Sequence, residues 1–216
     1  LAAELDGEAE PCDVADAAAL AAAAAAIASR HDAVHLLVNN AGIPARGTLL
    51  DVPLELAERV LAVNHHAGVR LTRLLLPCLR AAPAGDAHIV NVASVAGTIA
   101  LGQAGAYAAS KHAQVAFSRT LRTALAPDGI RVHTVLPGFV ATEGFPQAEL
   151  LAHPVLRRIV AEPERVARAI VRAVERDRAE VVVPRLPYRL ATILQGLSPG
   201  LAAALARRAV RPARPL

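Results

Sequence analysis

Short apolar runs, each long enough for one strand, alternate with longer segments of helical character along most of this chain. Residues 34–39 and 130–136 carry mainly Val, Leu and Ile on both faces, as strands do when both faces of a parallel sheet are covered. Strands separated by helices predict an α/β fold with a doubly wound parallel sheet. The other elements that we predict are helices over 17–28, 54–79 (bent near Asn64) and 104–125 and from Pro163, and strands ending at Ser94 and over 180–183.

The length of 216 residues fits one domain with a sizeable core. Hydrophobic residues make up 54% of the chain but aromatic residues only 2%, so Ala, Val, Leu and Ile must fill that core. Cys12 and Cys78 lack the spacing of a metal site or a redox motif and are expected to be free thiols in a reducing compartment. With no secretory signal and no convincing membrane span, the sequence predicts a cytoplasmic protein.

Residues 185–216 differ from the rest in charge, since they hold six arginines and no acidic residue. We therefore divide the chain into an α/β domain over 1–184 and a basic helical tail over 185–216. One interpretation of the tail is an amphipathic element that makes weak contact with a membrane surface or a partner. The other, which we favour, is a helix packed at a subunit interface. A single aromatic residue and no recognised module argue against nucleic-acid binding.

Lys111 is the only lysine among 23 basic residues, and it lies four positions after Tyr107. Residues four apart share one face of a helix, so the phenol and the ammonium would meet. The unperturbed pKa of a tyrosine is about 10, so one that acts as acid and base near neutral pH needs a positive neighbour. The pair predicts an acid–base site, and the alternative is a surface pair on an ordinary helix.

Three further strings stand at the ends of the apolar runs. Ser94 ends the run over 88–93 and lies thirteen residues before Tyr107; NNAG occupies 39–42; and PGFVAT follows at 137–142. In this order and spacing the strings resemble the short-chain dehydrogenase/reductase family, single-domain type, from about Leu1 to Pro184. The resemblance implies a Rossmann-like fold and an NAD(P)-dependent oxidoreductase that interconverts a carbonyl and a secondary alcohol.

The resemblance assigns four catalytic residues. Tyr107 would be the general acid in reduction and the base in oxidation. Lys111 would bind the nicotinamide ribose hydroxyls and lower the pKa of the tyrosine. Ser94 would hydrogen-bond the substrate oxygen, and the backbone of Asn64 would hold a water in a proton relay to the lysine.

The resemblance also assigns residues to the cofactor, which is NAD or NADP. Asp13 and Val14 would contact adenine, although Asp13 taken alone could equally be a helix N-cap. Asn40, Ala41 and Gly42 would approach the adenosine ribose, where glycine permits close contact. Those that would flank the nicotinamide, together with Tyr107 and Lys111, are Pro137, Gly138, Val140 and Thr142.

The front of the chain matches only part of the family pattern. No glycine-rich phosphate turn follows a first strand, so the resemblance implies that two strands and that turn precede Leu1 and that residues 8–14 form the third strand. A second function therefore stays open, a catalytically incompetent fragment that acts as an interaction surface. A sugar-nucleotide epimerase is disfavoured, because only a short segment separates Thr142 from Pro163. NAD and NADP are not distinguished.

The remaining expectations concern partners. The segment 143–161, rich in Leu and Val, is expected to cover an apolar carbonyl or alcohol substrate. Surplus apolar positions on the helices 54–79 and 104–125 predict a homo-oligomer paired through them. The eight histidines show no spacing typical of metal ligands, so no metal site is predicted.

Overall fold

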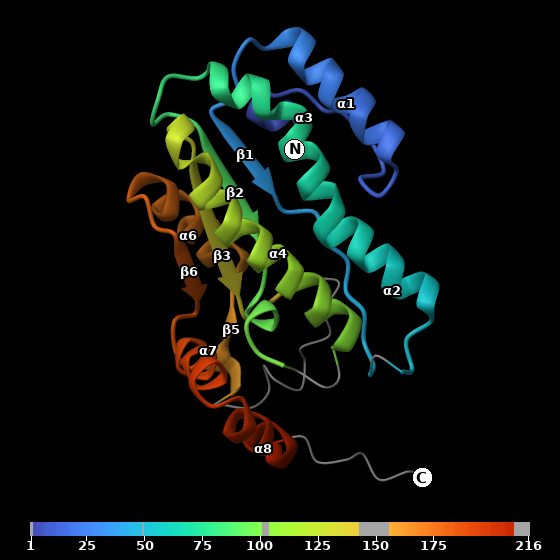
Figure 1. Cartoon of the computed structure of the whole chain (residues 1–216), viewed down its shortest axis with the longest axis vertical. Helices are drawn as coiled ribbons and strands as arrows, with labels where there is room; N and C mark the ends of the chain where they lie inside the picture. The colour runs from blue at the N-terminus through green and yellow to red at the C-terminus, as the bar shows by residue number, and fades with distance from the viewer. Residues whose placement is uncertain (1, 49, 101–103, 143–155, 210–216) are drawn as a thin grey trace.

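Four parallel strands form the central sheet of the part of the chain that the computed structural model describes, residues 2–48, 50–100, 104–142 and 156–209. Their order across the sheet is β1-β2-β3-β6, and they span Leu36–Asn39, His88–Val92, Arg131–Pro137 and Glu180–Val183. Helices cover both faces (Figure 1). The doubly wound, Rossmann-like α/β prediction is therefore confirmed. All three crossovers return to the same end of the sheet, as parallel pairing requires.

The helices lie close to their predicted bounds. The predicted helix over 54–79 is divided by a π-helical turn at Ala62–His66, which places the expected bend at Asn64. The α-helices are α1 Ala17–Arg30, α2 Leu54–Leu61, α3 Ala67–Ala81, α4 Gly105–Leu125, α6 Pro163–Glu175, α7 Tyr188–Leu197 and α8 Pro199–Ala209.

Side chains of successive residues in the central strands point to opposite faces of the sheet, because the backbone is pleated. On one face, Ile89 of β2 and Val132 of β3 pack with Leu79 of α3 in a cluster that also includes residues of α1 and α4. On the other face, Val90 and Val135 pack against α6. All of these side chains are almost fully buried, so the core is aliphatic, as the composition predicts.

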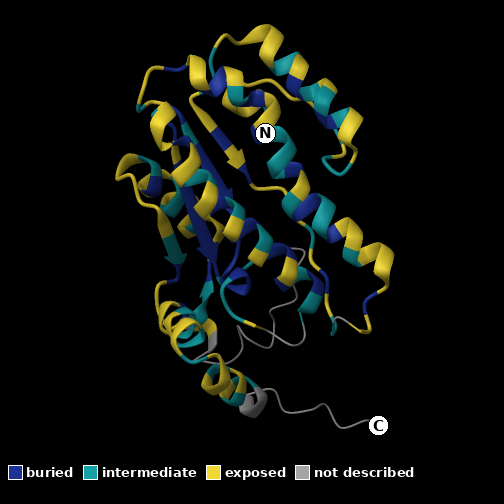
Figure 2. Cartoon of the chain, viewed as in Figure 1, coloured by how far each residue is buried: buried dark blue, intermediate teal, exposed yellow. Residues whose placement is uncertain are grey.

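The prediction of a strand over residues 8–14 is wrong. This segment is irregular and largely exposed, and it enters α1 through the N-cap Asp16, whose side chain accepts from the amides of Ala18 and Ala19. A strand needs a neighbouring backbone to supply its hydrogen bonds, and none of the described strands lies beside this segment. The edge strand β1 accordingly exposes Leu36 and Val38 (Figure 2).

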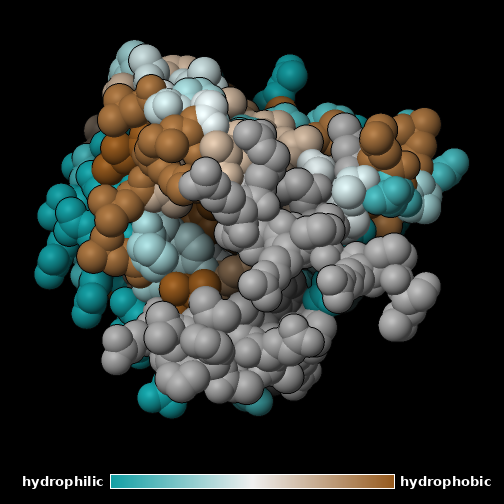
Figure 3. All heavy atoms as spheres, turned by 90° about the horizontal axis from the view of Figure 1, so that it is seen from below, coloured by the Kyte–Doolittle hydropathy of each residue, from teal (hydrophilic) through white to brown (hydrophobic). Residues whose placement is uncertain are grey.

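The carboxyl ends of the strands carry small additional elements. A two-stranded parallel pair, β4 Phe139–Val140 with β5 Val160–Ala161, follows β3, and α7 and α8 lie beyond it. Seen from that end, hydrophobic side chains form a broad group at the left of the view and a smaller one at the upper right (Figure 3). No described helix is long and apolar enough to cross a membrane. The predicted substrate cover over 143–161 falls largely on 143–155, outside the described residues.

Candidate active site

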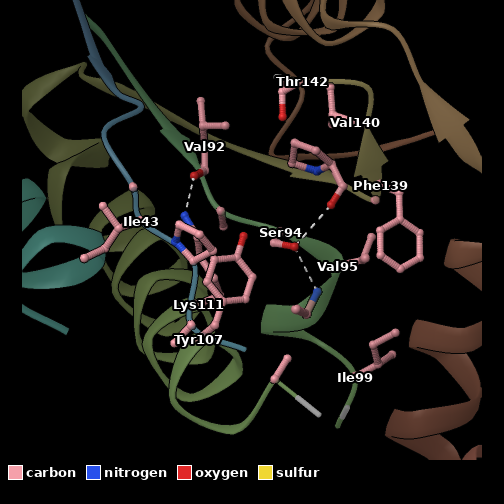
Figure 4. Close-up of a pocket in the computed structure, with 18 of the residues that line it drawn as sticks. Ile43, Val92, Ser94, Val95, Ile99, Tyr107, Lys111, Phe139, Val140 and Thr142 are labelled. Atoms are coloured by element: carbon pink, nitrogen blue, oxygen red, sulfur yellow. Dashed lines mark hydrogen bonds between the residues drawn. The ribbon is translucent and has the colours of Figure 1, made fainter. Parts of the chain in front are cut away.

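A cavity of about 560 Å³ opens at the carboxyl ends of β1, β2 and β3. Its walls come from the segments that follow these three strands and from the first turns of α4 (Figure 4). Tyr188 of α7 also lines it. Open α/β sheets bind their ligands in a crevice outside the carboxyl ends of the strands, which is where this cavity lies.

Ser94 and Tyr107 meet inside the cavity. Ser94 caps a short 3-10 turn after β2, where its Oγ accepts from the Ala96 amide at 3.2 Å and donates to the Pro137 carbonyl at 3.3 Å. The hydroxyl of Tyr107 points toward it from α4 (Figure 4). Burial raises the pKa of Tyr107, and a hydrogen bond with Ser94 opposes that rise.

Lys111 lies one helical turn beyond Tyr107 and is 4% exposed. Its Nζ donates to the Val92 carbonyl at 3.1 Å and to Oε1 of the buried Gln114 at 2.9 Å. The ammonium sits 5.8 Å from the centre of the Tyr107 ring. Burial among neutral groups lowers the pKa of Lys111 to about 8.

The expected effect of the lysine on the tyrosine differs from the structure. We expected Lys111 to lower the pKa of Tyr107, yet the net direction is upward, and the group that lowers it is Ser94. Desolvation of the phenol outweighs the other influences. The ammonium is held by the end of β2 and by Gln114 instead of by the phenol oxygen.

Gly42 and Asn64 shape the wall beside the lysine. The side chain of Asn64 accepts from the Ile43 amide at 2.8 Å and donates to the Ile43 carbonyl at 3.1 Å and to Ser110 Oγ at 3.0 Å. It thus ties the segment after β1 to α4. A Cβ on Gly42 would lie 3.3 Å from Asn64 Oδ1 and 3.6 Å from Lys111 Nζ, so glycine leaves space there.

Most of the predicted site residues line this one cavity. Asp13, Val14, Ala41 and Asn64 do not. Asp13 is exposed, 3.2 Å from Arg59, and its pKa is lowered by the Ala15 amide and by that guanidinium. It is not the N-cap of α1, a position taken by Asp16. The predicted residues that line the cavity are Asn40, Gly42, Ser94, Tyr107, Lys111, Pro137, Gly138, Val140 and Thr142.

Tyr188 also lines the cavity, although no sequence motif assigns it to the site. It is 7% exposed, its hydroxyl donates to the Ile159 carbonyl at 3.0 Å, and it accepts from the Phe139 amide at 3.3 Å. Its ring occupies the space into which a Cβ on Gly138 would project. The chain has only two tyrosines, and both line the cavity. The scarcity of tyrosine in this sequence is the signal that could have identified Tyr188 as a site residue.

A buried polar network below the cavity was also missed. Asn39 Nδ2 donates to Asn91 Oδ1 at 2.9 Å, and Asn91 Nδ2 donates to Ser118 Oγ at 3.0 Å. Ser118 in turn shares a 2.7 Å hydrogen bond with Thr134. The network joins β1, β2, β3 and α4, so it fixes the helix that carries the phenol and the ammonium relative to the strand ends.

The family model described as short chain dehydrogenase matches residues 2–149. Among curated relatives, the Xenopus laevis dehydrogenase/reductase SDR family member 7B is 36% identical over 88% of this chain and 60% of its own length. The Anopheles gambiae dehydrogenase/reductase SDR family protein 7-like is 32% identical over 88% of this chain and 62% of its own length. The chain thus spans about three fifths of the length of these relatives.

Solved structures are similar over most of the chain. The NADPH-bound carbonyl reductase from chicken fatty liver superposes with a TM-score of 0.71 at 25% identity, covering 83% of this chain and 76% of that one. The Pseudomonas aeruginosa RhlG/NADP active-site complex gives a TM-score of 0.70 at 28% identity, covering 80% and 73%.

Proposed function

The chain belongs to the short chain dehydrogenase family, and on that premise we propose that its cavity interconverts a carbonyl and a secondary alcohol with NAD or NADP. The observation that carries this proposal is the convergence of Ser94, Tyr107 and Lys111 in one cavity at the strand ends. A hydroxyl that can orient a carbonyl oxygen lies beside a phenol that can supply a proton, with a cation one helical turn away.

The residues present fit a nicotinamide cofactor. Gly42 leaves open the space beside the Lys111 ammonium that a Cβ would fill, and the ammonium lines the cavity. Lys111 would hold ribose hydroxyls, and Pro137, Gly138, Val140 and Thr142 would flank the nicotinamide. Asp13 and Val14, with Asn40 to Gly42, would bind the adenosine end. When bound, the cofactor supplies or accepts a hydride.

Tyr107 moves the proton. Because burial raises its pKa, the phenol is protonated at neutral pH and can donate to a carbonyl oxygen as that oxygen gains charge. Ser94 fixes the same oxygen, since its Oγ lies between the phenol and the carbonyl of Pro137. In the reverse direction the phenolate would take the proton back, and a positive Lys111 would stabilise it. Asn64 supports the site from behind by holding the segment after β1.

The substrate is proposed to be a small apolar carbonyl or alcohol. Apolar groups such as Ile43, Val95, Ile99 and Phe139 form most of the cavity surface around the polar side chains. A wall of this kind selects ligands by apolar area and leaves the orientation of one oxygen to the serine and the tyrosine. We also propose a homo-oligomer paired through α2, α3 and α4, located in the cytoplasm.

The test replaces each tyrosine in the protein expressed from its complete reading frame. Tyr107→Phe should reduce turnover by about a thousandfold or more while cofactor affinity, measured by nucleotide fluorescence, changes less than about threefold. Tyr188→Phe is the matched control, because it removes a hydroxyl from the same cavity that is held by Ile159 and Phe139. Turnover by Tyr107→Phe within a few-fold of the parent would overturn the assignment. No turnover by the parent on any apolar ketone or secondary alcohol would overturn the proposed activity.

A further inference from the structure

The helices α7 and α8 present an apolar surface to solvent. On α7, Leu190, Ile193 and Leu197 recur every three or four positions, which places them on one helix face, and Leu186 lies in the turn before the helix. In chain order these four side chains are 62%, 62%, 46% and 82% exposed. Leu201 and Leu205 of α8 are 51% and 46% exposed. We call these six side chains the tail apolar surface, and Figure 3 views the end of the molecule where they lie.

A basic groove of about 560 Å³ adjoins the start of α7, between α6 and the outer edge of β6. Its one carboxylate, Glu180, binds Arg119. Within the described part of the chain, none of the groove arginines has an acidic partner. The arginines that line it are Arg165, Arg168, Arg172, Arg176, Arg178, Arg185 and Arg189. We call this set the arginine groove.

The charge of this region opposes contact with a second copy. A two-fold interface places the same patch on both partners, and the chain has no acidic residue from Arg185 onward. Arg185 and Arg189 flank the apolar stripe of α7, so pairing through the stripe would bring arginines close to arginines. Like charges brought together in this way cost free energy unless an anion separates them. The occupant that complements both features is apolar and negatively charged.

We propose that the tail apolar surface and the arginine groove together dock the protein on an anionic lipid bilayer. The leucines would enter the headgroup–acyl boundary, and the guanidinium groups would bind lipid phosphates, often in bidentate fashion. The proposed contact is with the bilayer surface, because the leucines lie along one face of a helix. The cytoplasmic leaflet of a membrane combines negatively charged headgroups with an apolar interior.

The docking surface is rigidly connected to the cavity. Tyr188, at the first turn of α7, lines the cavity, and Thr192 shares a 3.0 Å hydrogen bond with Thr98, which follows the Ser94 turn. One face of α7 therefore closes the cavity wall while the other face carries the exposed leucines. A docked bilayer would lie one helix diameter from the site, where an apolar substrate could arrive from the lipid. This last consequence rests on the proposed function, whereas the docking itself does not.

Vesicle flotation tests the docking with the full-length protein. We expect binding to phosphatidylcholine vesicles that contain phosphatidylserine, weakening as salt is added, and little binding to phosphatidylcholine alone. The triple variant Leu190→Ser, Ile193→Ser, Leu197→Ser should bind about tenfold more weakly or worse. The double variant Arg185→Glu, Arg189→Glu should bind about thirtyfold more weakly or worse, because two charges that attract the phosphates are replaced by two that repel them.

Two control variants make single substitutions of the same kinds on other helices. Leu54→Ser removes a leucine that is 69% exposed on α2, and Arg73→Glu reverses an exposed arginine on α3. Both should float like the parent. Absence of flotation by the parent, or equal loss in the controls, overturns the proposal. So does sedimentation showing that the triple variant converts a dimer to a monomer while vesicle binding is unchanged, because the occupant is then a second copy. Turnover of a short water-soluble substrate is measured in parallel, so that failure of docking and failure of catalysis are recorded separately.

Discussion

Lys111 should make the stability of this protein depend on alkaline pH. The side chain is 4% exposed, and burial lowers its pKa from 10.5 to about 8. Between these two values the unfolded chain holds the lysine proton and the folded chain does not. The free energy of unfolding therefore rises as pH rises from about 8 to 10.5. This gain is lost again as pH falls through the folded pKa of about 8.

The size of the effect follows from the interval between the two pKa values. At about 1.4 kcal/mol for each pKa unit, the full window corresponds to about 3 kcal/mol, of which about 2 kcal/mol lies below pH 9.5. The substitution Lys111→Met keeps most of the volume and removes the titrating group. It leaves the Val92 carbonyl and Gln114 without their donor, but that penalty does not vary with pH over this range.

Urea unfolding of parent and variant, without nucleotide, at intervals from pH 7 to 9.5 measures the difference. The parent should gain about 2 kcal/mol over the variant across this range, a change several times the usual extrapolation error. The difference between the two proteins removes the contribution of every other titrating group. Curves that stay parallel from pH 7 to 9.5 would refute the reasoning, since they would mean that the buried ammonium keeps its ordinary pKa.

Three further expectations follow from contacts of the same structure. Unfolding free energy should fall as pH drops below about 6.5, because burial lowers the pKa of His88 and His133, so the unfolded chain binds protons first; urea melts at pH 5.5 and 7.5 check this. Gln114→Leu, which removes one of two partners of the Lys111 ammonium, should raise KM for the nucleotide about tenfold in steady-state kinetics. Phe117→Arg should convert an oligomer paired through α4 into monomers in sedimentation experiments.

Local patterns predicted the fold where an element depends on its own residues. The strands β2 and β3 are apolar on both faces because helices cover both, so their sequences alone identify them. The bend predicted near Asn64 is also confirmed, as a π-helical turn. The prediction of a strand over residues 8–14 was wrong for a different reason. A strand exists only where another backbone pairs with it, and composition says nothing about whether that partner is present.

The residues of the site likewise fall into those that the sequence predicted and those that it did not. Residues carried by a motif at a strand end, such as Ser94 and Gly138, were predicted and line the cavity. Residues whose role depends on contacts far along the chain were not. Asn39 and Asn91 are 52 positions apart and bond in the core, and Tyr188 reaches Phe139 across 49 positions. Neither hydrophobic periodicity nor a short motif can reveal a contact between residues so far apart in the sequence.

Desolvation acts on Tyr107 and Lys111 in opposite directions, and both directions favour the neutral form. It raises the pKa of the phenol and lowers that of the amine, so the pair resists the charged state in which the base form of the tyrosine would work. At neutral pH the phenol therefore keeps its proton, which is the state needed to protonate a carbonyl oxygen. Loss of that proton needs the lysine to be positive, and an anionic ligand in the cavity would favour that charge. We therefore expect the site to support carbonyl reduction without further change, whereas alcohol oxidation would need a bound ligand whose negative charge keeps the lysine positive.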